Sequence, residues 1–215
     1  MYKLKPKITI GGAGKGTETK GFDLYGELAM NLTDINRGAC AEISSPEEFA
    51  EHFKKAKNPL FIVGPWLLTS GVKGSGHTPI DTAAEIAKAG KFAVCATGDT
   101  AGPLKERGVK VDMECGILEI TGLYLTDASW KGVNGKGQHD FVLFNGVPCY
   151  FAERALNTLL LYAPWLKTYT ICHRFHHSAD YTWPRMNAEA YGEYKKKVIE
   201  LLKKAVEEKE AEKKL

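Results

Sequence analysis

The sequence lacks the features that would assign it to a membrane or a nucleic-acid-binding protein. No apolar run approaches the roughly 20 residues that a membrane helix needs, and no continuous apolar stretch follows the N-terminal lysines. The formal net charge is only +3, and the Lys and Arg residues are mixed with Glu. We therefore expect a cytoplasmic protein that binds neither membranes nor nucleic acids.

Cysteine is too sparse to give a disulfide or metal framework. The five cysteines are odd in number, widely scattered and without a CxxC pair. This pattern predicts buried, reduced thiols in a cytosolic protein. The cysteines are Cys40, Cys95, Cys115, Cys149 and Cys172.

The signatures of common nucleotide and acyl chemistry are also missing. No GxGxxG opens a helix after the first strand, and no GxSxG elbow of a hydrolase occurs. The glycine-rich segment 11–17 looks like a phosphate-binding loop, but Gly16 separates Lys15 from Thr17. A Walker A loop needs Ser or Thr directly after the lysine, so an ATPase is not expected.

What the sequence does contain is an alternation of helical and extended segments. Ser45, Pro46 and Glu48 form a capping box with proline at the first helical position. Apolar runs without alternation predict strands that are buried on both faces of a parallel sheet. The expected strands are 60–63, 92–96, 109–111, 141–144 and 168–172, and the expected helices are 46–56, 78–90, 116–127, 150–162 and one from about residue 187.

This alternation predicts an α/β fold with three layers and a doubly wound, mostly parallel, Rossmann-like sheet. The expected domain spans residues 44–206. Residues 1–43 read as a Gly-rich N-terminal extension that lies along a surface, and residues 207–215 as a charged, solvated helical tail. One globular domain with decorated ends is therefore expected.

Small-residue turns follow three of the expected strands. Ligands of open parallel sheets bind at the carboxyl ends of the strands, where glycine lets backbone N–H groups approach a phosphate. The same turns would also occur in an α/β fold without a ligand. The candidate cofactor-binding residues are Gly64, Pro65, Thr97, Gly98, Asp99, Asn145, Gly146 and Val147.

Thiols and imidazoles are the other candidates for chemistry. Cys172, His173, His176 and His177 are close in sequence, as soft-metal ligands can be, but no complementary ligand is evident elsewhere. Histidines facing solvent or a partner are the alternative. Cys149 begins a helix, which could lower its pKa, yet the sequence offers it no His partner.

The segment 121–151 carries a resemblance to a known family. Its specific part is Gly122-Leu123-Tyr124-Leu125-Thr126-Asp127, followed by Trp130, Gly132, Gly135, Gly137, Asp140 and the strand into Gly146. These residues resemble the epsilon subunit of the archaeal carbon monoxide dehydrogenase/acetyl-CoA decarbonylase/synthase complex. The similarity covers about residues 40–205.

The resemblance implies a Rossmann-type domain of the kind found in sirtuins, thiamine enzymes and electron-transfer flavoproteins. It also implies an accessory subunit without catalysis of its own, in which two epsilon chains associate with two large alpha subunits that carry the nickel-iron-sulfur centre. No tightly bound cofactor is implied, but FAD held near an iron–sulfur cluster is a suggested role. A stand-alone FAD- or NAD-binding redox module and a metal-dependent or thiol enzyme are the alternatives.

An accessory subunit should expose apolar side chains that a partner covers. We expect such a patch around Trp130, Tyr181 and Trp183. Trp130 adjoins the loop 131–137, in which glycine and lysine predominate. Trp130 is therefore either an interface anchor or a core residue that fixes the end of the preceding helix.

Overall fold

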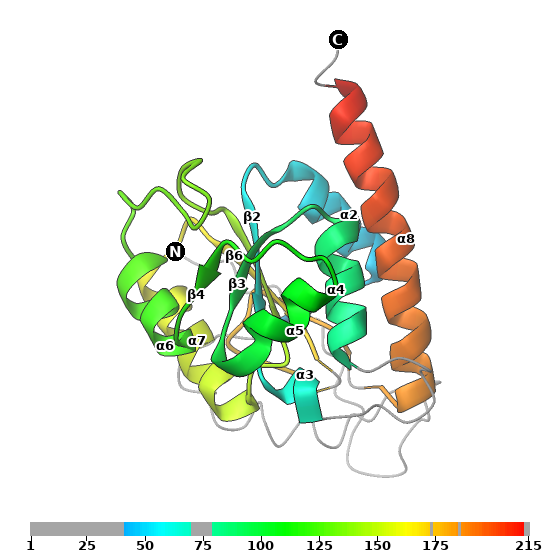
Figure 1. Ribbon diagram of the computed structural model, residues 1–215, viewed down its shortest axis with the longest axis horizontal. Helices are drawn as coiled ribbons and strands as arrows, with labels where there is room; N and C mark the ends of the chain where they lie inside the picture. Colours follow the sequence, from blue (N-terminus) through cyan, green and yellow to red (C-terminus); the bar gives the residue numbers. More distant parts are fainter. Residues whose placement is uncertain (1–40, 70–78, 173, 185, 213–215) are drawn as a thin grey trace.

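The computed structural model describes residues 41–69, 79–172, 174–184 and 186–212 (Figure 1). Most of the predicted N-terminal extension, with the glycine-rich segment 11–17 and Cys40, lies outside these residues, as does His173.

One parallel sheet forms the centre of the domain. In the described part of the chain it has seven strands in the order β1-β7-β6-β5-β2-β3-β4, and every neighbouring pair is parallel. From β4 to β7 this is the strand order of dinucleotide-binding folds. The chain builds β2, β3 and β4 outward in one direction and then β5, β6 and β7 outward in the other, so the strand order reverses between β2 and β5. The strands are β1 (Glu42–Ile43), β2 (Pro59–Val63), β3 (Ala93–Ala96), β4 (Met113–Glu114), β5 (Phe141–Asn145), β6 (Lys167–Ile171) and β7 (Tyr181–Thr182).

Helices cover both faces of this sheet. Figure 1 shows α2 (Pro46–Lys55), α4 (Pro79–Ala89) and α8 (Ala188–Glu212) on one side, and α6 (Ile117–Glu119) and α7 (Cys149–Tyr162) on the other. The remaining segments are α3 (Trp66–Thr69), η2 (Gly98–Thr100), α5 (Ala101–Glu106) and the π-helical turn η3 (Ile120–Tyr124). The predicted three-layer α/β fold is confirmed. None of the helices described is long and apolar enough to cross a membrane.

The unbroken apolar runs serve two cores at once. Phe61 and Val63 of β2 pack into the cluster under α2, α4 and α8, whereas Leu60 and Ile62 pack into the cluster under α7. Side chains alternate across a strand, so a strand with helices on both faces needs apolar residues at every position.

The predicted capping box of α2 is confirmed. The Ser45 hydroxyl accepts from the Glu48 N–H at 3.2 Å, and the Glu48 carboxylate accepts from the Ser45 N–H at 2.8 Å. Two N–H groups of the first turn, which no helical carbonyl reaches, are thereby satisfied.

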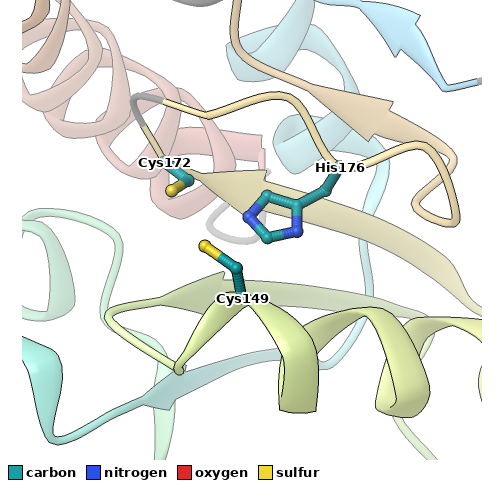
Figure 2. Close-up of side chains that lie close together, drawn as sticks. All are labelled: Cys149, Cys172 and His176. Atoms are coloured by element: carbon teal, nitrogen blue, oxygen red, sulfur yellow. The ribbon is translucent and has the colours of Figure 1, made fainter. Parts of the chain in front are cut away.

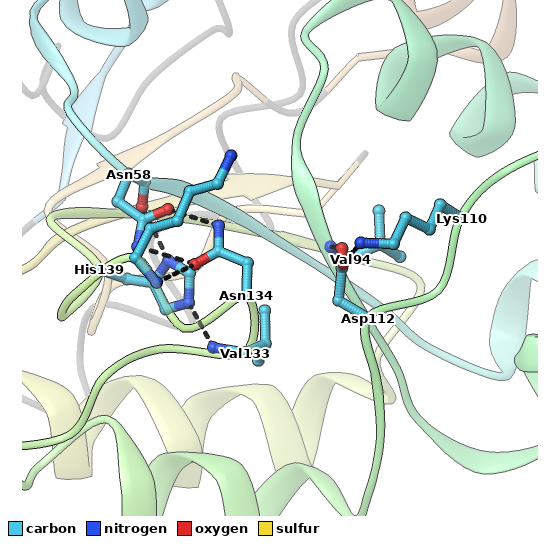
Figure 3. A network of polar contacts seen from close by, with 8 residues as sticks. Asn58, Val94, Lys110, Asp112, Val133, Asn134 and His139 are labelled. Atoms are coloured by element: carbon cyan, nitrogen blue, oxygen red, sulfur yellow. Dashed lines mark hydrogen bonds and ion pairs between the residues drawn. The ribbon is translucent and has the colours of Figure 1, made fainter.

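The strand expected at 109–111 is wrong by a few residues. The Val109 N–H bonds the Leu104 carbonyl and therefore closes the end of α5. The Asp112 N–H then bonds the Val94 carbonyl, and its carboxylate accepts from the Val94 N–H at 2.9 Å (Figure 3). Hydrogen bonding to β3 consequently begins at Asp112, and β4 itself spans Met113–Glu114.

The C-terminal segment is helical as expected, but it also makes specific contacts. Helix α8 continues to Glu212, and the Lys209 ammonium donates to the carbonyls of Phe53 and Ala56 at 2.8 and 2.7 Å. Lys54 pairs with Glu208 at 2.6 Å. A cation at the carbonyl end of α2 opposes the partial negative charge there, so the last turns of α8 stabilise α2.

Candidate functional site

The predicted cofactor turns meet at one edge of the sheet. Strands β3, β2 and β5 are neighbours and parallel, so the turns that follow them lie side by side. This edge includes the point where the strand order reverses, the usual position of a dinucleotide in such folds.

Two of these turns are packed directly against each other. The Gly64 N–H donates to the Asn145 carbonyl at 2.8 Å, and the Trp66 N–H donates to the Gly146 carbonyl at 2.9 Å. A Cβ on Gly64 would lie 2.4 Å from the Gly146 oxygen, and one on Gly146 would lie 2.2 Å from Leu67 Cγ. These glycines therefore allow the close contact between the two turns.

The remaining predicted cofactor residues divide into buried and exposed ones. Thr97 is buried, and its hydroxyl donates to the Val63 carbonyl at 3.0 Å. Asn145 and Val147 are also buried, whereas Pro65 is partly exposed and packs beside Gly98. Gly98 and Asp99 are exposed, so they are the predicted residues that a ligand could reach without rearrangement.

A second group of reactive side chains lies at the same edge of the sheet, after β5 and β6. Cys149 is the first residue of α7, Cys172 directly follows β6, and His176 lies between β6 and β7. One ligand atom from each falls within 4.8 Å of the other two. Figure 2 shows the two thiols and the imidazole pointing toward one another.

Glu153 orients the imidazole of this cluster. It lies one turn after Cys149 in α7, and its carboxylate accepts from His176 Nδ1 at 2.7 Å. The Nε2 atom is then the nitrogen available to the thiols. His177 lies 3.5 Å from the other carboxylate oxygen of Glu153, and His176 itself is only 2% exposed.

The cluster shifts the pKa of each of its members. The contact with the Cys172 thiol, helped by His176 and Arg174, lowers the pKa of Cys149 to about 4 against the effect of burial. The same contact and burial raise the pKa of Cys172. Burial alone would lower the pKa of His176, but Cys149 and Glu153 raise it to about 9. The site therefore favours a thiolate beside an imidazolium.

The structure revises the thiol and metal candidates. Cys149 supplies the complementary group that the sequence did not reveal for Cys172 and His176, and His176 supplies the base that it did not reveal for Cys149. His177 contacts Glu153 and does not belong to the three-residue group. The start of α7 was the signal in the sequence, but the pairing with residues after β6 was not.

The glycine-rich loop after Trp130 is held to the start of β2 by a polar network (Figure 3). Asn134 and Asn58 exchange side-chain hydrogen bonds, one of them at 2.8 Å. The Val133 N–H donates to His139 Nε2 at 3.1 Å, so Nδ1 carries the proton that bonds the Asn58 carbonyl. Burial lowers the pKa of His139, which keeps the ring neutral.

The expected aromatic patch is wrong for Trp183. This side chain is 0% exposed and packs against Tyr191 and Tyr194 under α8. Tyr181 is partly exposed and stacks on Tyr169 at 4.6 Å. Trp130 is partly buried against Tyr124 and His139, as expected for a residue that fixes the end of the preceding helix.

Exposed large apolar side chains gather instead on the layer formed by α6, η3 and α7. Helices α6 and α7 lie side by side on this face (Figure 1). Six of the eight such residues found in the described chain belong to this layer or directly follow it. They are Leu118, Leu123, Tyr150, Leu161, Tyr162 and Trp165, and we call this set the α6–α7 face.

The π-helical turn η3 explains how this face is exposed. The Leu125 N–H donates to the Ile120 carbonyl at 2.9 Å, a bond between residues five apart. Ile120 and Leu125 both enter the core, whereas Leu123 is 68% exposed. A π-turn often marks a functional position, and this one overlaps the segment 122–127 that carries the family resemblance.

The comparisons with known proteins agree with that resemblance. Residues 26–202 match the family model described as CO dehydrogenase beta subunit/acetyl-CoA synthase epsilon subunit. The acetyl-CoA decarbonylase/synthase complex subunit epsilon of Methanothermobacter thermautotrophicus is 39% identical over 158 residues, which are 74% of this chain and 86% of that protein.

A second relative is similar over nearly its whole length. The acetyl-CoA decarbonylase/synthase complex subunit epsilon of Methanothrix soehngenii is 30% identical over 189 residues, which are 86% of this chain and 97% of that protein. The chain therefore belongs to the family of CO dehydrogenase beta subunits and acetyl-CoA synthase epsilon subunits.

Proposed function

We propose that this chain is a non-catalytic accessory subunit that docks on the large alpha subunit of a nickel-iron-sulfur carbon monoxide dehydrogenase. It would stabilise an assembly of two alpha and two epsilon chains. Family membership supports this proposal, because the relatives are named as epsilon subunits of a decarbonylase/synthase complex. The metal centre that interconverts CO and CO₂ would belong to the partner.

The α6–α7 face is the observation that carries the docking proposal. Leu123 is 68% exposed and Tyr162 is 65% exposed, and both lie on the same helical layer. Gathered exposed apolar side chains on a folded protein commonly mark an interaction surface. Full burial of an exposed Leu side chain is worth about 1.5–3 kcal/mol before the costs of association.

Charge substitutions on this face should separate docking from folding. We expect Leu123→Asp and Tyr162→Asp each to raise the dissociation constant for the large subunit by at least about tenfold, because 1.4 kcal/mol corresponds to a factor of ten. Calorimetric or interferometric titration of the purified large subunit with the full-length chain measures this constant.

The matched control is Leu68→Asp, because Leu68 is an exposed leucine on α3 and outside the α6–α7 face. It should bind like the unchanged chain, and all three variants should unfold at similar temperatures. Equal affinity of the three variants would contradict docking through the α6–α7 face. A chain that purifies from its native cells alone and as a monomer would contradict the accessory role altogether.

The second candidate function is to hold FAD near an iron–sulfur cluster of the partner. The strand order favours it, because the chain reverses between β2 and β5 as in dinucleotide-binding folds. The packed turns at Gly64 and Gly146 oppose binding at the centre of this edge. Gly98 and Asp99 are exposed, so FAD could still contact them.

Fluorescence titration with FAD tests this second function. We expect no saturable change with the isolated chain, because the Gly64 and Gly146 turns are closed. Saturable binding is expected with the assembled complex, and Asp99→Ala should weaken it by about tenfold if a ribose hydroxyl bonds the carboxylate. Absence of binding to the complex as well would remove the flavin role.

A further inference from the structure

We propose that Cys149, Cys172 and His176 bind one Zn²⁺ ion at the carboxyl edge of the sheet, with the fourth coordination position left to water or another small ligand. Figure 2 shows the three side chains pointing toward one another from α7, from the end of β6 and from the segment before β7. This proposal does not depend on the docking role of the α6–α7 face.

The distances suit a tetrahedral ion. Zn–S bonds of about 2.3 Å and Zn–N bonds of about 2.0 Å place the ligand atoms about 3.5–3.8 Å apart. The ligand atoms of the cluster all lie within 4.8 Å of one another. Each pair therefore needs to close by no more than about 1.3 Å, which side-chain torsions can supply.

The surroundings of His176 are those of a metal ligand. Histidines that bind metals usually donate their other ring N–H to a carboxylate, which fixes the orientation of the ring. Glu153 accepts from Nδ1 at 2.7 Å, and the His176 backbone N–H donates to the Thr182 hydroxyl at 3.3 Å. The Thr182 contact fixes the backbone of His176, and the Glu153 contact orients its ring with Nε2 toward the thiols.

The position of Cys149 also favours a thiolate ligand. It begins the 14-residue helix α7, where the N-terminal end of a helix stabilises negative charge. Two sulfur atoms and one imidazole nitrogen form a donor set that zinc accepts readily, and three protein ligands leave one position open. On binding, the ion displaces the Cys172 thiol proton and the His176 Nε2 proton, which are released to solvent, and it supplies the positive charge between the two thiolates.

A second pair of thiols in the same protein provides an internal comparison. The sulfur atoms of Cys95 and Cys115 lie 3.7 Å apart, but the metal-ligand grouping found in the described residues contains neither of them. Two thiols alone give too few ligands for a tetrahedral ion. Zinc should therefore distinguish Cys149 and Cys172 from Cys95 and Cys115.

Metal titration of the full-length chain tests the proposal. The reduced, chelator-treated protein should take up one Zn²⁺ in competition with a chromophoric chelator, and Co²⁺ should give thiolate charge-transfer and tetrahedral d–d absorption. Cys149→Ser, Cys172→Ser and His176→Gln should each weaken Zn²⁺ binding at least about 100-fold. Cys115→Ser should leave the affinity unchanged.

Glu153→Gln distinguishes a positioning residue from a ligand. Loss of an outer-shell carboxylate typically weakens metal binding about 10–100-fold. The Co²⁺ spectrum of this variant should keep its thiolate bands, because all three ligands remain. A spectrum without them, or an unchanged affinity, would contradict the role given to Glu153.

Thiol protection tests the site without any substitution, so it holds even if a variant fails to fold. With Zn²⁺ bound, alkylation mapped by mass spectrometry should slow at least about tenfold at Cys149 and Cys172 and remain unchanged at Cys115. Equal alkylation with and without Zn²⁺ would overturn the proposal. So would a Cys149–Cys172 disulfide that forms equally fast in the presence of Zn²⁺.

Discussion

Gly64→Ala is expected to destabilise the protein by about 3 kcal/mol or more, because its methyl group would meet backbone atoms on the neighbouring turn. The new Cβ would lie 2.4 Å from both the Gly146 oxygen and the Val147 nitrogen. Neither atom belongs to a flexible side chain, so β2 and β5 would have to separate at the centre of the sheet. Urea unfolding followed by circular dichroism measures the loss.

The control for this change is Gly192→Ala in α8. A Cβ at Gly192 would have no heavy atom within 4 Å outside its own helical turn. Alanine is favoured over glycine within a helix by about 1 kcal/mol, so this variant should be slightly more stable than the unchanged protein. If Gly64→Ala also unfolds at the unchanged urea concentration, the close approach of the two turns is wrong.

Trp183→Ala should be comparably damaging, because it would leave a large cavity under α8. Removing a fully buried Trp side chain typically costs about 3–5 kcal/mol. Trp183 is 0% exposed and packs at 4.6 Å, between ring centroids, on Tyr194. The free energy of unfolding, from urea or thermal denaturation of the full-length chain, measures the effect.

Two further substitutions separate the core role of Trp183 from an interface role. Trp130→Ala should cost less, because Trp130 is only partly buried. Trp183→Phe should also cost less than Trp183→Ala, since it keeps most of the volume and removes the indole N–H, which has no hydrogen-bond partner among the described residues. A Trp183→Ala protein with full stability but poor complex formation would restore the interface interpretation.

Local signals in the sequence predicted much of the fold correctly. The capping box at Ser45 and Glu48 depends on atoms three residues apart, so no distant contact can displace it easily. The strands β2 and β5 were evident because burial on both faces demands an unbroken apolar run. Because these runs indicate a parallel sheet, and parallel strands end at the same edge, the turns after them could also be expected to lie together.

Features that depend on distant contacts could not be predicted in this way. Strands β1 and β7 are two residues long, too short for a pattern to appear. The pairing of Cys149 with His176 requires that β5 and β6 be neighbours, and Glu153 contacts His176 across 23 positions of the chain. Glycines at Gly64 and Gly146 looked suited to a phosphate because close backbone packing and ligand contact require the same residue type.

The misplacement of Trp183 has a specific physical reason. Tyr181 and Trp183 are two positions apart in an extended segment, so both point to the same face of the sheet. That face carries α8; Trp183 belongs to the core beneath it, and the partly buried Tyr181 packs against that core. Recognition of β7 would have assigned Trp183 to the interior.

The π-helical turn η3 separates the packing of the core from the side chain exposed on the surface. Ile120 and Leu125 both point inward because the hydrogen bond there joins residues five apart, and Leu123 between them stays largely exposed. On the docking surface proposed above, a substitution at Leu123 should therefore change the affinity for the partner and leave the stability of the fold nearly unchanged. A helix built this way allows its exposed side chain to change without a penalty in folding.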